Sequence, residues 1–373
     1  MLKIEIILGC LIALLFESAW GQHRSLNLTI DSYGLSIGNS QRVNGIRLNF
    51  RDYYLQRVNG INLTIWKPKE PVRGIINGLA LGLTIAGAEK VHGLALAPVG
   101  VMGGKSLQGI IVGAIGAGAG DEINGVAIGG LGLGSGGDIT GIAIGGLGLG
   151  CGNDLQGIMI GGFGLGSGGD ITGIAIGGLG LGSGNDLKGI MIGGLGVGCG
   201  QDITGLAISG LGLGSGGSVT GIGLALVGAG AGRRVKGLFM AGVGVGAGES
   251  VTGVIIGGVG VGAGGVLRGL AIGGVGVGAP TVEGVVVSGV AAGAKDFTGL
   301  AVAPAYFRIE KGGLMRGVSV SAVNLNKGEL QGLSIGLFNF ARFLNGIQLG
   351  VLNYAKNNPK WLRLLPVMNL HFD

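Results

Sequence analysis

A glycine that recurs every sixteen residues constrains the fold of this chain more than any other feature of its sequence. The glycine opens the same phrase each time, and the segment GIAIGGLG from Gly141 to Gly148 is the typical form. We call these positions the anchor glycines, and at the strict spacing they are Gly125, Gly141, Gly157, Gly173, Gly189, Gly205, Gly221, Gly237, Gly253 and Gly269. The series extends at looser spacing to Gly45, Gly60, Gly78, Gly93 and Gly109 before them and to Gly284, Gly299, Gly317, Gly332 and Gly346 after them. A period this regular indicates one structural unit that is stacked many times along the chain.

The composition fits a folded repeat protein better than a fibrous or disordered glycine-rich chain. Glycine contributes 91 of the 373 residues, whereas proline contributes 7 and charged residues only 12%. The glycines follow neither a three-residue period nor a random pattern, so collagen and a disordered linker both fit poorly. Isoleucine, leucine and valine recur regularly between the glycines, and they can supply a buried core.

Within one unit the large apolar residues alternate with small ones, and the alternation changes phase once. Ile142 and Ile144 stand at even positions, whereas Leu147 and Leu149 stand at odd positions. The two glycines between them predict a tight turn between two short strands. We therefore predict an all-β fold, an elongated β-solenoid of about twenty coils of 15–16 residues, with Ile and Leu inward and Gly and Ala outward.

An outer-membrane β-barrel is the alternative fold. Each unit has the length of a membrane-crossing strand with a hairpin, and Phe372 stands near the end of an alternating C-terminal pattern. A barrel of this kind needs a polar lumen face, which the central units lack. The change of phase would also place a bulge in the middle of nearly every strand. We therefore favour the solenoid.

The first residues have the pattern of a secretory signal peptide. Lys3 precedes the apolar run from Ile6 to Phe16, and Ala19-Trp20-Gly21 is a small-x-small cleavage site. The apolar run is too short to anchor the chain across a bilayer. The predicted organisation is a signal peptide over 1–21, an N-terminal polar cap with the first repeats over 22–72, a glycine-rich central repeat array over 73–283, C-terminal polar repeats over 284–356 and a C-terminal tail over 357–373.

The residue two positions after each anchor glycine is predicted to point outward. This position is polar near both ends of the chain, as at Arg47 and Gln348, and apolar in the middle. An exposed apolar stripe usually marks an interface, so we expect self-association or contact with a cell-envelope surface, although a surface of small residues that only covers the strands is an alternative. The predicted interface residues are Ala143, Met159, Ala175, Met191, Phe239 and Ile255.

A column of aspartates lies three residues before successive anchor glycines. Its members are Asp138, Asp154, Asp170, Asp186 and Asp202. The segment from Gly182 to Asp186 (GSGND) is similar to part of the calcium-binding nonapeptide repeat, but that motif recurs every nine residues and this one every sixteen. Calcium bound along the column is one interpretation, and aspartates that cap backbone amides of the turns are the other.

The rest of the chain offers little chemistry. His23, His92 and His371 are isolated and have no metal-ligand spacing, and the serines recur at interchangeable positions. Cys151 and Cys199 occupy a position that serine fills in other units, so we expect free thiols. The net charge of +6 contains no run of lysine and arginine that would indicate nucleic-acid binding. We expect a non-enzymatic protein, with no small-molecule substrate and no cofactor other than calcium.

The terminal units resemble a family of repeat proteins. The segments NGIQLGVLNYAKN (345–357), GLSIGLFNFARFLNG (332–346) and LLPVMNLHF (364–372) are similar to surface-repeat proteins of Bacteroidetes and Leptospira, which carry tandem NGxQxGLxN-type units behind a signal peptide. The central units differ, because Ala and Gly replace the Gln and Asn of the motif. The resemblance implies a location in the cell envelope and brings no catalytic residues.

Taken together, these features predict an exported, non-enzymatic repeat protein at the bacterial cell surface or outer membrane. We expect a structural or adhesive element that acts through a flat apolar face rich in Gly and Ala.

Overall fold

The computed structural model of this chain describes residues 25–372. The predicted signal peptide over 1–21 and His23 lie outside the described residues. Among residues 25–372 no helix is long and apolar enough to cross a membrane.

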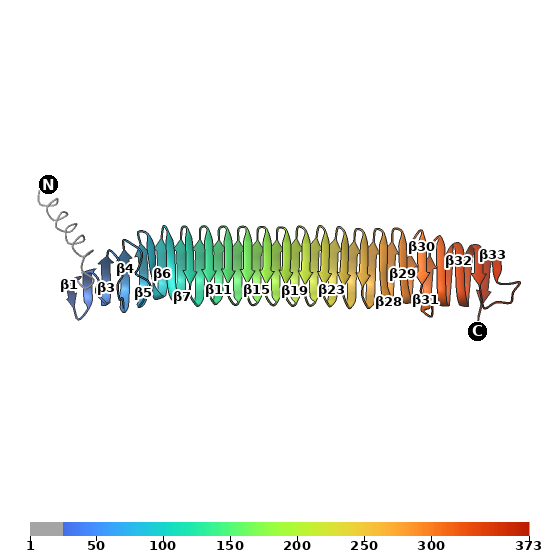
Figure 1. Cartoon of the computed structure of the whole chain (residues 1–373), viewed down its shortest axis with the longest axis horizontal. Helices are drawn as coiled ribbons and strands as arrows, with labels where there is room; N and C mark the ends of the chain where they lie inside the picture. The colour runs from blue at the N-terminus through green and yellow to red at the C-terminus, as the bar shows by residue number, and fades with distance from the viewer. Residues whose placement is uncertain (1–24, 373) are drawn as a thin grey trace. The chain divides into compact units, whose positions relative to one another are not determined.

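The chain folds as an all-β solenoid of about 18 turns, which confirms the predicted fold class (Figure 1). Successive coils pair in parallel with an offset of one repeat, so that Gly141 lies beside Gly125 on one side and beside Gly157 on the other. Neighbouring strands of an outer-membrane barrel run antiparallel. The barrel alternative is therefore wrong.

The described residues divide into two compact units, one that ends at Gly184 and one that begins at Asn185. In unit 1, β1 pairs antiparallel with β2, and the later strands pair in parallel from coil to coil. The strands of unit 1 are β1 (Ser25–Ile30), β2 (Tyr33–Gly38), β3 (Arg42–Asn49), β4 (Arg57–Thr64), β5 (Ile75–Gly82), β6 (Ile85–Ala97), β7 (Gly100–Gly113), β8 (Gly116–Ala119), β9 (Glu122–Gly129), β10 (Gly132–Ser135), β11 (Asp138–Gly145), β12 (Gly148–Cys151), β13 (Leu155–Gly161), β14 (Gly164–Ser167), β15 (Ile171–Gly177) and β16 (Gly180–Ser183).

Unit 2 repeats this arrangement, and its last strand pairs antiparallel with the long strand before it. Its strands are β17 (Leu187–Gly193), β18 (Gly196–Cys199), β19 (Ile203–Ser209), β20 (Gly212–Ser215), β21 (Val219–Ala225), β22 (Gly228–Ala231), β23 (Arg234–Ala241), β24 (Gly244–Ala247), β25 (Ser250–Gly257), β26 (Gly260–Ala263), β27 (Val266–Gly273), β28 (Gly276–Ser288), β29 (Ala291–Val302), β30 (Tyr306–Ile309), β31 (Leu314–Val320), β32 (Val323–Ala355) and β33 (Leu364–His371).

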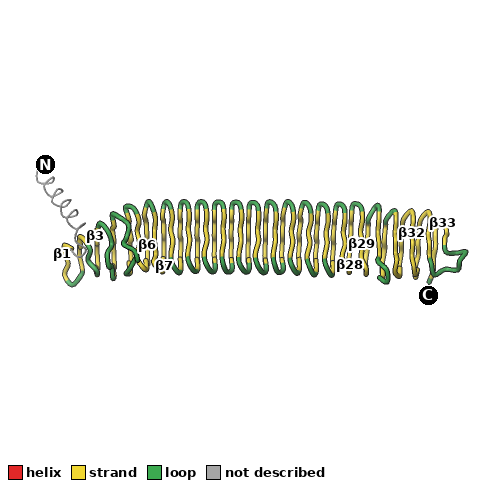
Figure 2. Tube along the Cα trace, in the orientation of Figure 1, coloured by secondary structure: helices red, strands yellow, loops and turns green. Residues whose placement is uncertain are grey.

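One coil consists of a long strand, a turn, a short strand and a second turn (Figure 2). In the coil that holds β11 and β12, the turns pair with the preceding coil as the strands do. The backbone N–H of Leu147 donates to the carbonyl of Leu131 at 2.7 Å, and that of Gly146 donates to Gly129 at 2.9 Å. Hydrogen bonds therefore satisfy the turns as well as the strands, which the buried backbone requires.

The anchor glycine is fixed by the close approach of neighbouring coils. Gly141 has a φ of 117°, which side chains rarely adopt, and the other anchors have similar values. A Cβ added at Gly141 would lie well under 3.0 Å from the carbonyl oxygen of Gly125 in the preceding coil. Both the backbone conformation and the space therefore require glycine, which is the physical cause of the sixteen-residue period.

The core contains the side chains that the sequence suggested would face outward. On β11, Ile139 and Ala143 are 1% and 0% exposed, whereas Ile142 is 40% exposed. A Cβ at Gly145 would collide with the carbonyl oxygen of Gly148, so the two strands of a coil converge at this turn. The interior is narrow at this end, so it accommodates the small residues Gly145 and Ala143. Because side chains alternate along a strand, Ile142 then points outward.

The prediction that Ile lines the interior and Ala the exterior is therefore wrong for Ile142 and Ala143, although Ile139 of the same strand is buried. It is correct for Leu149 of the short strand, which is 3% exposed, but wrong for Leu147 in the turn, which is 45% exposed.

Packing along the stack explains why small and large residues alternate two positions after the anchor. In unit 1, Met159 lies beside Ala143 on one side and Ala175 on the other, and all three are fully buried. In unit 2, a Cβ at Gly223 would collide with the ring of Phe239 in the next coil. A small residue in one coil thus makes space for a large one in its neighbour.

Candidate functional site

The six predicted interface residues belong to the core. The prediction that they form an outward stripe is wrong, because strand alternation from the buried turn glycine places this position inward. The exposed fractions are 0% for Ala143, Met159, Ala175, Met191 and Phe239, and 1% for Ile255.

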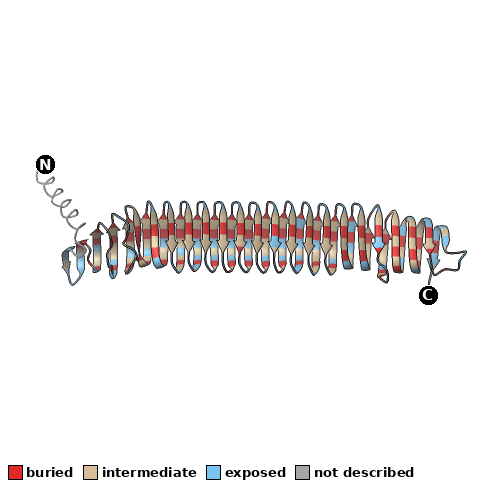
Figure 3. Cartoon of the chain, in the orientation of Figure 1, coloured by how far each residue is buried: buried red, intermediate tan, exposed pale blue. Residues whose placement is uncertain are grey.

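The outward positions of the long strands are one and three residues after each anchor glycine, and they carry aliphatic side chains. We call these positions the aliphatic face. Buried and more exposed stretches alternate along the strands (Figure 3). A third apolar position, six residues after the anchor, is exposed at the turn, and we call it the corner column. In unit 1 the exposed members of the face include Ile110, Ile142, Ile158 and Ile174, and those of the corner column include Leu131, Leu147, Phe163 and Leu179.

Unit 2 has the same two features. Up to residue 290, the exposed members of its aliphatic face are Ile190, Ile222, Leu238, Met240, Val254, Val285 and Val287, and those of its corner column are Leu195, Leu211, Val227, Val243, Val259, Val275 and Val290. From Leu211 to Val290, the backbone N–H of each corner residue donates to the carbonyl of the corner residue in the preceding coil, as in Val259 to Val243 at 2.7 Å. The corner column is therefore held in register by backbone hydrogen bonds.

The outward positions of the short strands in the central coils are glycines, as the sequence predicted. A Cβ at Gly164 or Gly180 in unit 1, or at Gly212 in unit 2, would meet nothing within 4 Å. These glycines are thus not required by the packing of their own unit, unlike the anchor glycines. The face that they form has no side chains of its own.

The aspartate column caps the backbone of the turns. In unit 1 a carboxylate oxygen of Asp138 accepts from the N–H of Asp154 at 3.1 Å, and one of Asp154 accepts from Asp170 at 2.8 Å. In unit 2 Asp186 accepts from the N–H of Asp202 at 3.0 Å. The hydrogen bonds confirm the capping interpretation.

The described residues contain no cluster of ligands that would support calcium binding along the column. Within residues 25–372 no three side chains of His, Cys, Asp or Glu are grouped as a metal site. Asp186 also contacts the Lys188 ammonium at 2.9 Å, and Asp202 contacts the Arg233 guanidinium at 3.1 Å. The hydrogen bond from Lys188, followed by that from the Asp202 amide, lowers the pKa of the Asp186 carboxyl. The cations next to these two aspartates are thus side chains of the chain itself.

The thiols and hydroxyls of the second turn also bond to backbone atoms. The Cys151 thiol donates to the carbonyl of Asn153 at 3.3 Å, and the Ser167 hydroxyl donates to the same carbonyl. Cys151 and Cys199 are free thiols. Burial raises the pKa of both thiols above the ordinary value, which keeps them protonated near neutral pH.

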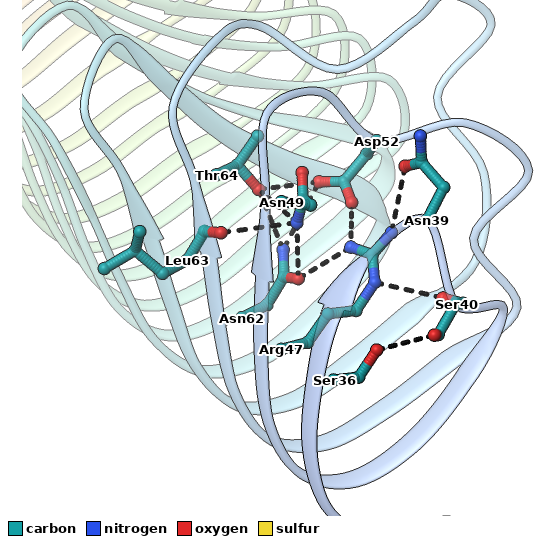
Figure 4. Close-up of polar contacts among 9 residues, drawn as sticks. All are labelled: Ser36, Asn39, Ser40, Arg47, Asn49, Asp52, Asn62, Leu63 and Thr64. Atoms are coloured by element: carbon teal, nitrogen blue, oxygen red, sulfur yellow. Dashed lines mark hydrogen bonds and ion pairs between the residues drawn. The ribbon is translucent and has the colours of Figure 1, made fainter. Parts of the chain in front are cut away.

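The polar residues near the start of unit 1 form a buried network that the sequence analysis missed (Figure 4). The Arg47 guanidinium is fully buried; it pairs with the Asp52 carboxylate and donates to the Asn62 side-chain oxygen at 2.8 Å. The Thr64 hydroxyl donates to Asp52 at 2.8 Å. Arg47 and Asn62 stand two residues after their anchor glycines, so the prediction that this position is outward failed here too.

A ladder of asparagines fills the interior near the end of unit 2. The Asn324 amide donates to the Asn339 side-chain oxygen at 2.8 Å, and the Asn339 amide donates to that of Asn353 at 2.8 Å. All three residues are buried. The last Asn of the NGxQxGLxN-type unit, Asn353, is therefore an interior residue, as is Gln348, which is 0% exposed. The polar end units differ from the central units in their cores.

The histidines within the described residues bond to asparagines. His92 Nδ1 lies 3.0 Å from the Asn77 side-chain oxygen, at the end of an outward ladder in which Asn77 donates to Asn59 at 2.7 Å. His371 Nδ1 lies 2.6 Å from the Asn358 side-chain oxygen. Each histidine thus extends a local polar network.

Two grooves differ in character. A groove of about 500 Å³ in unit 1 has polar walls that include Lys105, Asp121 and Glu122. A groove of about 800 Å³ in unit 2 is apolar, and its walls include Ile335 and Leu337. The second groove therefore belongs to the aliphatic surface of unit 2.

The fold and these surfaces define a parallel β-solenoid repeat protein. The chain matches no protein-family profile, no curated protein and no solved structure.

Proposed function

We propose that the chain is an exported, non-enzymatic structural or adhesive repeat protein of the bacterial cell surface. The observation that carries this proposal is the aliphatic face, which continues from coil to coil within each unit. The exposed side chains of this face are those of Ile, Leu, Val and Met, whereas the short strands of the central coils present glycines outward. An exposed apolar surface of this kind marks a contact surface.

The roles of the polar side chains support a structural function. The carboxylates of Asp138 and Asp154 accept backbone N–H groups, and the Ser167 hydroxyl donates to a backbone carbonyl. In unit 2 the Ser209 hydroxyl donates to the carbonyl of Leu195 at 3.0 Å. The groups that could perform chemistry thus hold neighbouring coils together.

Export is supported by the N-terminal sequence, in which an apolar run precedes the small residues Ala19 and Gly21. The test is expression of the full chain in a Gram-negative bacterium, with cell fractionation and N-terminal sequencing. We expect a mature N-terminus at Gln22 in the envelope fraction, and digestion by protease added to intact cells.

The control is a chain without residues 2–21, which should stay in the cytoplasm. An unprocessed N-terminus with the full chain in the cytoplasm would refute the proposed location. Envelope location with full protection from added protease would refute exposure at the cell surface.

A further inference from the structure

The aliphatic face of unit 2 is an ordered surface made of only four residue types. From residue 206 to residue 287, every position one or three residues after an anchor glycine is Ile, Leu, Val or Met. The pairing of the strands places Leu206 beside Ile222, and Leu238 beside Val254. The side chains therefore form continuous rows at the spacing of β-strands, about 4.8 Å.

The exposed area of this surface is close to what a stable interface needs. The fourteen exposed side chains of the unit 2 face and its corner column are each between 36% and 52% exposed. Full burial of an aliphatic side chain contributes about 1.5–3 kcal/mol, which at about 25 cal/mol per Å² corresponds to about 60–120 Å² of surface. Together they expose roughly 370–730 Å², somewhat more than half of it on the corner column, and a standard protein interface buries about 800 Å² on each partner.

The border of the face has the polar character of an interface rim. The residue before each anchor glycine points outward beside the face, and it is Lys236, Thr252, Arg268 and Glu283 in four successive coils. Arg268 and Glu283 form an ion pair at 2.7 Å. A polar rim with charges of both signs around an aliphatic centre is typical of protein–protein contacts.

The residue types favour another sheet over a lipid surface as the partner. Membrane interfaces select Trp and Tyr, which sit at the level of the headgroups. The positions from 206 to 287 instead carry aliphatic residues, many of them β-branched, which pack well against the pleated surface of a second sheet. A copy of the same chain presents rows with the same spacing, so its side chains can interdigitate along the whole face.

We propose that the aliphatic face of unit 2, together with its corner column, packs against the same surface of a second copy of this chain, in a two-fold symmetric dimer. The two sheets lie about 10 Å apart, and the two rims remain in water. This inference rests on the proposed structural role, to which it adds the partner. It does not depend on export, since the dimer forms from purified mature chain.

The test uses the chain from Gln22 to Asp373 and measures its mass by sedimentation velocity and light scattering over a range of concentrations. The double substitution Ile222→Glu and Val254→Glu places two carboxylates in the centre of the face. The matched control is Thr220→Glu and Thr252→Glu, in the same two strands but in the rim. Thr220 lies beside Lys236, which makes the rim tolerant of Glu.

We expect the wild type and the rim variant to be dimers at micromolar concentration. Carboxylates buried without partners should raise the dissociation constant of the face variant by more than about a hundredfold. Circular dichroism must show similar melting temperatures for the two variants. A monomeric wild type, or a face variant that dimerises as the wild type does, would overturn the proposal. Binding of a monomeric wild type to phosphatidylcholine vesicles would overturn it in favour of a lipid partner.

Discussion

The two kinds of glycine in one coil should respond oppositely to the same substitution. Gly157 is an anchor glycine with a φ of 120°, and a Cβ there would collide with the carbonyl oxygen of Gly141. Gly164 lies in the next strand of the same coil, and a Cβ there would meet nothing within 4 Å. Both residues can be changed to alanine, so composition and position in the array stay matched.

The structure sets the size of the expected difference. The disfavoured backbone conformation of Gly157→Ala costs about 1–3 kcal/mol, and displacement of the neighbouring coil adds to this, so we expect a loss of at least about 3 kcal/mol. Gly164→Ala restricts only the unfolded chain and should change stability by between zero and about +1 kcal/mol. At roughly 2–4 °C per kcal/mol, the first variant should melt about 6–12 °C below the wild type.

Thermal and urea unfolding followed by circular dichroism measures the difference. The wild type is the reference, and the retained β signal before the transition shows that each variant is folded. Equal melting temperatures for the two variants, or a larger loss for Gly164→Ala, would refute the assignment of the anchor glycines.

Three further predictions concern the core, a thiol and the aspartate column. Met159→Ala should lower the unfolding free energy by about 2–5 kcal/mol, since the neighbouring coils already have alanine there and cannot fill the cavity; a loss below about 1 kcal/mol in urea unfolding would contradict this. Cys151 should react with iodoacetamide at pH 8 more slowly in the folded chain than in urea, since burial raises its pKa; equal rates followed by mass spectrometry would be evidence against burial. The Asp186 carboxyl has a lowered pKa in the folded chain, so it stabilises the fold above about pH 4 and ceases to do so as the pH falls through that lowered value. Asp186→Asn should therefore be less stable than the wild type at pH 7, with a difference that shrinks toward pH 2, and a difference independent of pH would count against the capping role.

The sequence alone was sufficient to predict the repeat and the class of fold. The anchor glycine, the two-residue alternation and the turn glycines describe a local conformation that hardly depends on distant contacts. A parallel stack follows because identical units can pair only with their own neighbours. The aspartate caps were also among the interpretations, since a carboxylate before a turn is a common acceptor for backbone amides.

The direction of the side chains was not predictable by the rule that large apolar residues lie inside. Gly145 and Gly148 approach so closely that the coil is narrow at this turn. The sequence predicted the turn, but it did not show how closely the two strands approach there. The buried pair of Arg47 and Asp52 was missed for a related reason, since a charged residue in a repeat is ordinarily read as exposed. Ala143 and Met159 alternate along the stack because a large residue in one coil needs a small residue in the neighbouring coil. This contact between coils cannot be seen in the sequence of a single unit.

Labelling of single cysteines tests the orientation of the strands most directly. The background is Cys151→Ser with Cys199→Ser, since serine occupies this position in other coils. Ile158→Cys and Met159→Cys are then compared in folded, dilute protein with a maleimide reagent. Ile158 is 39% exposed and Met159 is 0% exposed, so we expect rapid labelling at 158, and labelling at 159 only after unfolding. Rapid labelling at 159 with protection at 158 would contradict the account of the core and of the surface built on it.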